Sequence, residues 1–234
     1  MRTEPLLIFF LAFLSAVILI LVLIIILISS QLQKSTKLKA KQFARYNLIT
    51  LKNKIIFLGD SLTEFFPIDE FFHSYNPYNR GIASDTTDGV LKRLETNVIA
   101  MDPSKVFVQI GTNDLIHRKT KHPETVAANI IKIIEQLKES LPTTEIYLIS
   151  LYPVNMRAYF FSMFFVLNRK NKDIRKINSI LREYCEKENI PFIDLYPLLA
   201  DEKGNLKREY TVEGIHINFS GYEQIAKALL PYLE

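Results

Sequence analysis

The sequence predicts an α/β fold in which helices cover both faces of a parallel sheet, with one membrane-spanning helix before it. Two patterns predict the sheet: short apolar runs end in glycine or a polar residue, and amphipathic helical segments separate these runs. A third pattern, an uncharged apolar segment near the N-terminus, predicts the span. With 234 residues, 48% of them hydrophobic and 23% charged, the chain fits one globular domain and excludes a disordered or collagen-like protein.

The uncharged segment runs from Leu6 to Ile28, and its only polar residue is Ser15. About 20 apolar residues are enough for a helix that crosses a bilayer. A secretory signal peptide has a shorter apolar core and a small-residue cleavage site, which Ile28-Ser29-Ser30 matches poorly. A helix that is apolar on all sides also has nothing in a domain of this size to surround it. We therefore predict an uncleaved transmembrane anchor over residues 6–28, with a cleaved signal as the alternative.

The positive charge lies in the N-terminal part of the chain. Residues 1–45 carry six of the 29 Lys/Arg and one of the 25 Asp/Glu, so the other 189 residues carry 23 and 24. A nucleic-acid-binding protein needs positive charge on its folded domain, so we predict no nucleic-acid partner. Since the basic residues follow the span, the positive-inside rule favours a cytoplasmic domain, and an extracytoplasmic domain is the alternative.

Residues 29–50 are predicted as a basic juxtamembrane linker and residues 51–234 as the folded domain. The linker either lies on anionic headgroups or is a solvated connector. The single cysteine, Cys185, excludes an intrachain disulfide framework and a cysteine-rich zinc site. The sequence makes no prediction of oligomeric state.

The domain alternates predicted strands with predicted helices. The strands are the apolar runs 54–58, 106–110, 146–149 and 191–193, and an irregular strand that ends at Gly81. The helices are the amphipathic segments 125–141, 173–188 and 220–232. In parallel sheets the functional groups gather at the carboxyl ends of the strands, and the polar clusters of this sequence follow the predicted strands.

The first polar cluster is Gly59-Asp60-Ser61-Leu62, directly after the first strand. A serine in a sharp strand-to-helix turn exposes its hydroxyl, which an adjacent base can activate for attack on an acyl group. Taken alone, the serine is more simply explained as the N-cap of a helix.

Three further clusters favour the nucleophile. Asn79-Arg80-Gly81 and Gly111-Thr112-Asn113-Asp114 end neighbouring strands, and backbone N–H groups with an Asn amide are the donors of an oxyanion hole. Glu213-Gly214-Ile215-His216 places a carboxylate three residues before a histidine, close enough to orient the ring. Together they supply a nucleophile, a base, an acid and oxyanion donors.

These blocks resemble the SGNH hydrolases, the GDSL-type esterase and lipase superfamily, and its platelet-activating-factor-acetylhydrolase-like and lysophospholipase-like members. The resemblance covers about residues 54–232, on the matching blocks Gly59-Asp60-Ser61-Leu62-Thr63, Asn79-Arg80-Gly81-Ile82 with Asp85-Thr86-Thr87, Gly111-Thr112-Asn113-Asp114, and Glu213-x-x-His216 with Asn218 and Gly221-Tyr222. It implies a flavodoxin-like three-layer α/β/α sandwich with a five-stranded parallel sheet. It also implies Ser61 as nucleophile, His216 as base, and an oxyanion hole formed by the N–H groups of Ser61 and Gly81 and the side chain of Asn113.

Two positions depart from the family pattern. Glu213 stands where the family usually has Asp, and a Glu can serve because the acid mainly fixes the imidazole tautomer and its charge. Ala83-Ser84 stands where many relatives have Ser-Gly, which changes the local turn.

The resemblance implies a membrane-anchored serine ester hydrolase that cleaves a carboxylic ester of a lipid or an acylated small molecule, with no cofactor and no metal. Two alternatives are an acyl transferase or deacetylase acting on cell-envelope glycans, and a catalytically silent binding module. The histidines outside the motif, His73, His117 and His122, match no metal-ligand spacing and are predicted at the surface.

The connection from Tyr152 to Asn171 is long and apolar for an α/β domain. We predict that its aromatic side chains bind substrate by lining an acyl pocket, or that they enter the membrane; the alternative is a short helix packed into the core. The aromatic residues concerned are Phe160, Phe161, Phe164 and Phe165.

Overall fold

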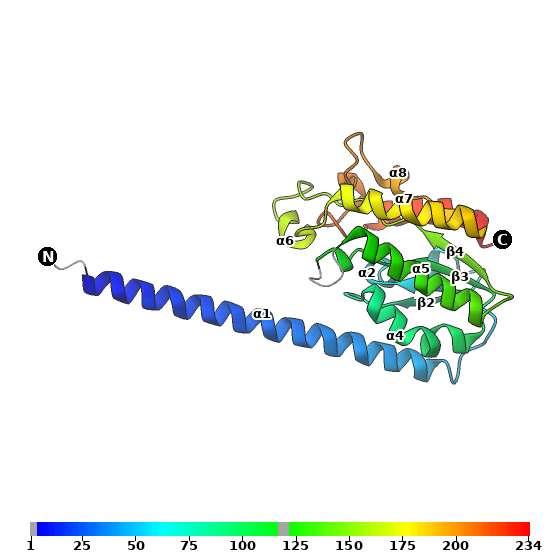
Figure 1. The fold of residues 1–234 in the computed structure, drawn as a ribbon, viewed down its shortest axis with the longest axis horizontal. Coiled ribbons are helices and arrows are strands. Elements are labelled where there is room, and N and C mark those ends of the chain that lie inside the picture. Colours follow the sequence, from blue (N-terminus) through cyan, green and yellow to red (C-terminus); the bar gives the residue numbers. More distant parts are fainter. Residues whose placement is uncertain (1–3, 117–121) are drawn as a thin grey trace. The chain divides into compact units, whose positions relative to one another are not determined.

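The computed structural model describes residues 4–116 and 122–234 (Figure 1). The chain divides into two compact units, with the division between Lys39 and Ala40. The first unit is helical, and the second contains the sheet and the polar clusters singled out in the sequence.

The first helix, α1, runs from Glu4 to Tyr46. Within it, Ile8–Ile28 is long and apolar enough to cross a membrane, and none of its described side chains is buried. Apolar side chains exposed along a whole segment favour a lipid environment. A signal sequence near an N-terminus has the same length and composition, so both explanations of this segment stand.

The C-terminal end of α1 belongs to the second unit. The Phe43 side chain is 7% exposed, and the guanidinium of Arg80 lies over its ring at 4.8 Å. Nδ2 of Asn97 donates a hydrogen bond to the carbonyl of Ala40 over 3.0 Å. The predicted linker 29–50 is therefore helical for most of its length, and its last part packs on the domain because these contacts bury an aromatic ring and satisfy a polar side chain.

The sheet has five parallel strands in the order β2-β1-β3-β4-β5. This is the strand order of the flavodoxin-like folds, so the predicted fold class is confirmed. Gly59 pairs with Gly81 on one side and Gln109 on the other, so neighbouring strands end at the same edge of the sheet. The strands are β1 (Ile55–Gly59), β2 (Tyr78–Gly81), β3 (Lys105–Gln109), β4 (Glu145–Ile149) and β5 (Phe192–Ile193).

Helices cover both faces of the sheet (Figure 1). The helices are α2 (Ser61–Glu64), α3 (Ile68–Phe71), α4 (Thr87–Asn97), α5 (Pro123–Ser140), α6 (Ser162–Val166), α7 (Asn171–Glu188), α8 (Tyr196–Leu199) and α9 (Phe219–Leu229). Alternate strand residues face opposite layers: Ile56 and Leu58 pack with α4, α5 and α7, whereas Phe57 packs with α2, α3 and α9. Short 3-10 turns are η1 (Ile99–Met101), η2 (Asp114–Ile116), η3 (Arg208–Tyr210) and η4 (Leu230–Tyr232).

Candidate active site

The turn after β1 positions Ser61 at the start of α2. Asp60 is the N-cap: its Oδ1 accepts the N–H of Leu62 over 2.9 Å. A Cβ at Gly59 would lie 2.3 Å from the carbonyl oxygen of Gln109, so only glycine allows the strand to pass this close to β3. The serine is therefore not the cap of its helix, and its hydroxyl is left for other contacts.

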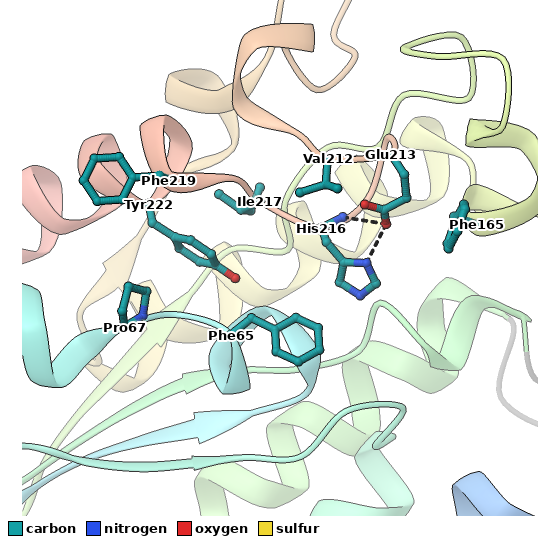
Figure 2. A pocket seen from close by; sticks show the side chains of 9 residues that line it. All are labelled: Phe65, Pro67, Phe165, Val212, Glu213, His216, Ile217, Phe219 and Tyr222. Carbon is teal, nitrogen blue, oxygen red and sulfur yellow. Dashed lines mark hydrogen bonds and ion pairs between the residues drawn. The ribbon is translucent and has the colours of Figure 1, made fainter.

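The loop before α9 places His216 beside the serine. Nε2 of His216 lies 3.0 Å from Oγ of Ser61. Oε1 of Glu213 lies 2.5 Å from Nδ1 of His216 and also accepts the backbone N–H of His216 over 3.1 Å (Figure 2). Thr211 fixes the loop, because its Oγ1 accepts the N–H of Gly214 and donates to the carbonyl of His216. The structure thus brings the predicted acid, base and nucleophile into one hydrogen-bonded chain.

Asn113 follows β3 and is held by both ends of its amide. Its Oδ1 accepts Nη2 of Arg169 over 2.8 Å, and its Nδ2 donates to the carbonyl of Asp85 over 3.0 Å. The same Nδ2 lies 3.5 Å from a carboxylate oxygen of Asp60, the residue before the nucleophile. The amide nitrogen is thus directed toward the turn that carries Ser61, and it donates to the Asp85 carbonyl and, over the longer distance, to the Asp60 carboxylate.

Gly81 has a different place from the one predicted. Its N–H donates to Oδ1 of Asn79 over 2.8 Å, so this donor already has a partner. A Cβ at Gly81 would lie 2.2 Å from the backbone nitrogen of Glu64, so the glycine is required by the close packing of β2 on α2. The sequence-based choice of the Gly81 N–H as an oxyanion donor therefore does not fit the geometry.

Ser84, in the turn after β2, has a backbone N–H without a hydrogen-bond partner in the described chain, unlike the N–H of Gly81. Its φ is +64°, in the left-handed region, and the residue is exposed. Within the described part of the chain its N–H makes no hydrogen bond, and the turn closes behind it when the N–H of Asp85 donates to Ile82 over 3.1 Å. Asp85 is the residue whose carbonyl accepts the Asn113 amide, so the free N–H lies one residue from that contact.

Buried acids surround the turn. Burial raises the pKa of Asp60 to about 7, against the opposing hydrogen bond from the N–H of Leu62. Burial also raises the pKa of Asp114 to about 6, although Thr87 donates to this carboxylate from its hydroxyl and its N–H. Both acids are explained by turn and helix-start hydrogen bonding, and among the described residues no cluster of His, Cys, Asp or Glu could hold a metal ion.

A hollow of about 540 Å³ adjoins His216. Figure 2 shows Phe219, Tyr222 and Pro67 on one side of the histidine and Phe165 on the other. The hollow is lined by Phe65, Pro67, Phe165, Val212, Glu213, His216, Ile217, Phe219 and Tyr222.

The predicted aromatic loop divides between the hollow and the surface. Phe165 lines the hollow, whereas Phe160, Phe161 and Phe164 do not and are 85%, 62% and 66% exposed. The loop does contain a short helix, α6, but only its Val166 enters the main apolar core. His73 and His122 are exposed as predicted, and His117 lies outside the described residues.

Sequence reasoning missed Ser84 and Arg169. Ser84 contributes a backbone group, which every residue but proline has, so its identity carried only the signal that it replaces a glycine of the family pattern. Arg169 is 6% exposed and touches Asn113. The available signal was an arginine shortly after the apolar part of a long loop.

Comparisons with known proteins find relatives of similar sequence and fold. The model of the GDSL-like lipase/acylhydrolase family matches residues 57–224. The platelet-activating factor acetylhydrolase IB subunit alpha1 of Bos taurus is 26% identical over 182 residues, which are 75% of this chain and 73% of that protein. A solved structure from Streptococcus pneumoniae, described as a platelet activating factor, has a TM-score of 0.82 and 31% identity, and the match covers 89% of this chain and 97% of that one.

The N-acylneuraminate cytidylyltransferase of Escherichia coli O18:K1:H7 is 30% identical over 169 residues, which are 72% of this chain. The chain spans 37% of that relative's length, so the similarity concerns one part of a longer protein.

Proposed function

Because this chain belongs to the GDSL-like lipase/acylhydrolase family, we propose that it hydrolyses a carboxylic ester through an acyl-enzyme formed on Ser61. The observation that carries the proposal is the unbroken chain from Glu213 through His216 to Ser61, with contacts of 2.5 and 3.0 Å. This is the arrangement by which a base activates a serine and an acid orients the base.

The reaction follows from these contacts. His216 Nε2 takes the hydroxyl proton of Ser61 as Oγ bonds to the ester carbonyl carbon. The adduct collapses when the carbon–oxygen bond to the alcohol breaks, and the alcohol leaves with the proton from Nε2. Water then gives a proton to Nε2 and attacks the acyl carbon, and Ser61 regains the proton as the carboxylic acid leaves. Glu213 holds Nδ1–H and stabilises the imidazolium in both steps.

The oxyanion hole of this proposal uses the N–H groups of Ser61 and Ser84 and the amide of Asn113. Ser84 replaces Gly81 because the Gly81 N–H is bonded to Asn79, whereas the Ser84 N–H has no partner among the described residues. A preorganised donor of this kind is worth about 10² to 10³ in rate.

The experiment that tests this function is labelling of the full chain with a fluorophosphonate, which reacts only with an activated serine. We expect one labelled site, identified by mass spectrometry as Ser61, together with hydrolysis of soluble short-chain esters. Ser61→Ala should lose both. Absence of labelling and turnover in a folded sample would refute the proposal and favour a catalytically silent module.

A second candidate is removal of an acyl group from a glycan, or its transfer to one. The observation in its favour is the 30% identity to part of a relative named for an N-acylated sugar acid. Adding an acylated sugar and a sugar acceptor to the assay distinguishes this candidate from the ester hydrolase. Release of free acid from lipid-like esters, with no acceptor product, supports the ester hydrolase.

We also propose that residues 6–28 anchor the enzyme in a membrane. The apolar length of Ile8–Ile28, and the absence of buried side chains among its described residues, support the anchor. In a bacterial expression host, the full chain should stay with the membrane after carbonate washing, and its intact mass should include the N-terminus. A soluble product that has lost this segment would show a cleaved signal instead. The side of the membrane is testable in the same cells by protease accessibility.

Three phenylalanines of the loop do not line the hollow, and together they form an aromatic patch: Phe160, Phe161 and Phe164. Their side chains are 85%, 62% and 66% exposed, and neighbouring exposed apolar side chains of this kind mark an interaction surface. We propose that the patch enters the lipid surface. Replacing all three by serine should reduce hydrolysis of an ester embedded in phosphatidylcholine vesicles several-fold relative to a soluble ester. An equal effect on both substrates would contradict this role.

A further inference from the structure

The hollow beside His216 is almost entirely apolar. Its polar groups are His216 and Glu213, which bond to each other, and the hydroxyl of Tyr222, which donates to the carbonyl of Leu62 over 3.0 Å. Among the residues that the structure describes, its wall therefore offers no cation and no free donor to a phosphate or a sugar. A volume of about 540 Å³ is within the range that holds a ligand of about 300 to 1,000 Å³.

The position of the hollow decides which part of an ester can enter it. Neither Asn113 nor Ser84 lines it, so it lies apart from the groups proposed to hold the carbonyl oxygen. His216 lines it, and Nε2 of this residue must reach the oxygen of the departing alcohol to protonate it. Phe65 lies on the hollow's side of the imidazole, and its ring centroid is 5.4 Å from that of His216.

On the basis of the proposed function, we propose that this hollow binds the alcohol portion of the substrate, and that the preferred esters carry their hydrocarbon on the alcohol. The acyl group, attached to the carbonyl carbon, lies outside this hollow. The favoured substrate class is therefore an acyl ester of an apolar, lipid-like alcohol.

Two isomeric esters test the proposal with the full chain in nanodiscs. Hexyl acetate and ethyl hexanoate have the same atoms but place the long chain on opposite sides of the ester. We expect kcat/KM for hexyl acetate to exceed that for ethyl hexanoate by at least about tenfold, because the additional methylenes on the alcohol are buried. Equal values, or a preference for ethyl hexanoate, would overturn the proposal.

Variants of the lining locate the effect. Val212→Ser and Phe219→Ser alter exposed lining residues and should lower the ratio of hexyl acetate to ethyl acetate hydrolysis at least about threefold. Leu230→Ser is the matched control, since Leu230 is exposed, apolar and outside the hollow, and its ratio should not change. Equal ratios in all three variants would place the alcohol elsewhere. Fluorophosphonate labelling of Ser61 reports separately on the proposed function, and its absence would overturn both proposals.

A different observation concerns Arg169, whose buried guanidinium joins the apolar loop to the site. Nε donates to the carbonyl of Thr112 and Nη2 to Oδ1 of Asn113, each over 2.8 Å. Nη1 donates to the carbonyls of Phe165 and Val166 over 2.9 and 3.2 Å. The guanidinium has no acceptor, so it selects the amide oxygen of Asn113 and leaves the amide nitrogen to face the reaction.

We infer that Arg169 is a positioning residue, which sets the orientation of the Asn113 amide and ties it to α6. This inference also rests on the proposed function. Arg169→Met should lower kcat about 10- to 100-fold with little change in KM, because the donor acts mainly on the transition state. Arg169→Lys keeps the charge but not the planar set of N–H donors, and it should retain part of the activity.

A double-mutant cycle separates this role from a structural one. In an Asn113→Ala background, Arg169→Met should cost less than about threefold, because its target is gone. If Arg169→Met lowers kcat by the same factor in both backgrounds, or changes KM alone, the inference is overturned. If thermal melting shows that Arg169→Met does not fold, the same cycle is run with Arg169→Lys, with the same two outcomes. If the unmodified chain is not labelled by the fluorophosphonate, the proposed function itself has failed.

Discussion

Two turns follow neighbouring strands at the same edge of the sheet, and they present different kinds of group. After β1, the buried turn is closed by the Asp60 carboxylate and presents the side chain of Ser61 to His216. After β2, the turn with exposed Ser84 at its corner, the exposed turn, is closed by the N–H of Asp85 on Ile82 and by the N–H of Ala83 on Glu64. It leaves the N–H of Ser84 without a partner in the described chain. The first turn acts through side-chain identity, whereas the second acts through backbone conformation, and substitutions at the two turns should differ accordingly.

The largest predicted difference is between two serine-to-alanine substitutions. Ser61→Ala removes the nucleophile and should lower kcat by about 10⁴ to 10⁶. Ser84→Ala keeps the N–H and should change kcat by less than about threefold. Both are measured on a soluble acetate ester, with circular dichroism as the control for folding. A large loss in Ser84→Ala would show that its hydroxyl, and not its backbone, serves the site.

The next effect concerns the acid, whose action again depends on side-chain identity. Glu213→Gln keeps the size of the side chain but removes the charge that stabilises the imidazolium, and should lower kcat by about 10³ to 10⁴. Glu213→Asp keeps the charge on a shorter chain and should lose less. If both variants lose activity equally, the length of the side chain matters as much as its charge.

The same contrast explains what the sequence could predict. The strands follow from apolar runs, and Ser61, Asn113, Glu213 and His216 stand out because only certain side chains perform such chemistry. Their meeting point follows from strand ends that share one edge of a parallel sheet. Family pattern and spacing therefore go far toward both the fold and the side chains of the site.

Backbone and packing features were beyond that reasoning. The Gly81 N–H has a partner only because the Asn79 side chain folds back onto it, which depends on the strand's exact path. The arginine that holds Asn113 comes from a loop whose course the sequence does not determine. The packing of Phe43 on the domain likewise depends on a contact with Arg80, far along the chain.

The Asp60 carboxyl of the buried turn should also make the stability of the protein depend on pH. Since burial raises the pKa of Asp60 from 3.8 to about 7, folding favours the protonated carboxyl. Its contribution to the free energy of unfolding is complete below about pH 4 and is lost as the pH rises to about 7, by at most about 1.4 kcal/mol per pH unit. Asp60→Asn should therefore become more stable relative to the unmodified chain over this interval, measured by urea unfolding. A constant difference would show that the carboxylate is not destabilised by burial.

The smallest effect tests the exposed turn by its conformation. Ser84 has φ +64°, where a Cβ is unfavourable, so Ser84→Gly should raise the free energy of unfolding by about 0.5 to 1 kcal/mol while the N–H, and with it kcat, is retained. Asn189→Gly is the matched control, since Asn189 has φ +54° at the end of α7, and asparagine tolerates this region better. Its gain should be smaller and without effect on kcat. A stabilised Ser84→Gly that loses activity would mean that the side chain at residue 84 holds the turn in its reactive form. In that case the exposed turn resembles the buried one more closely than its backbone contacts suggest.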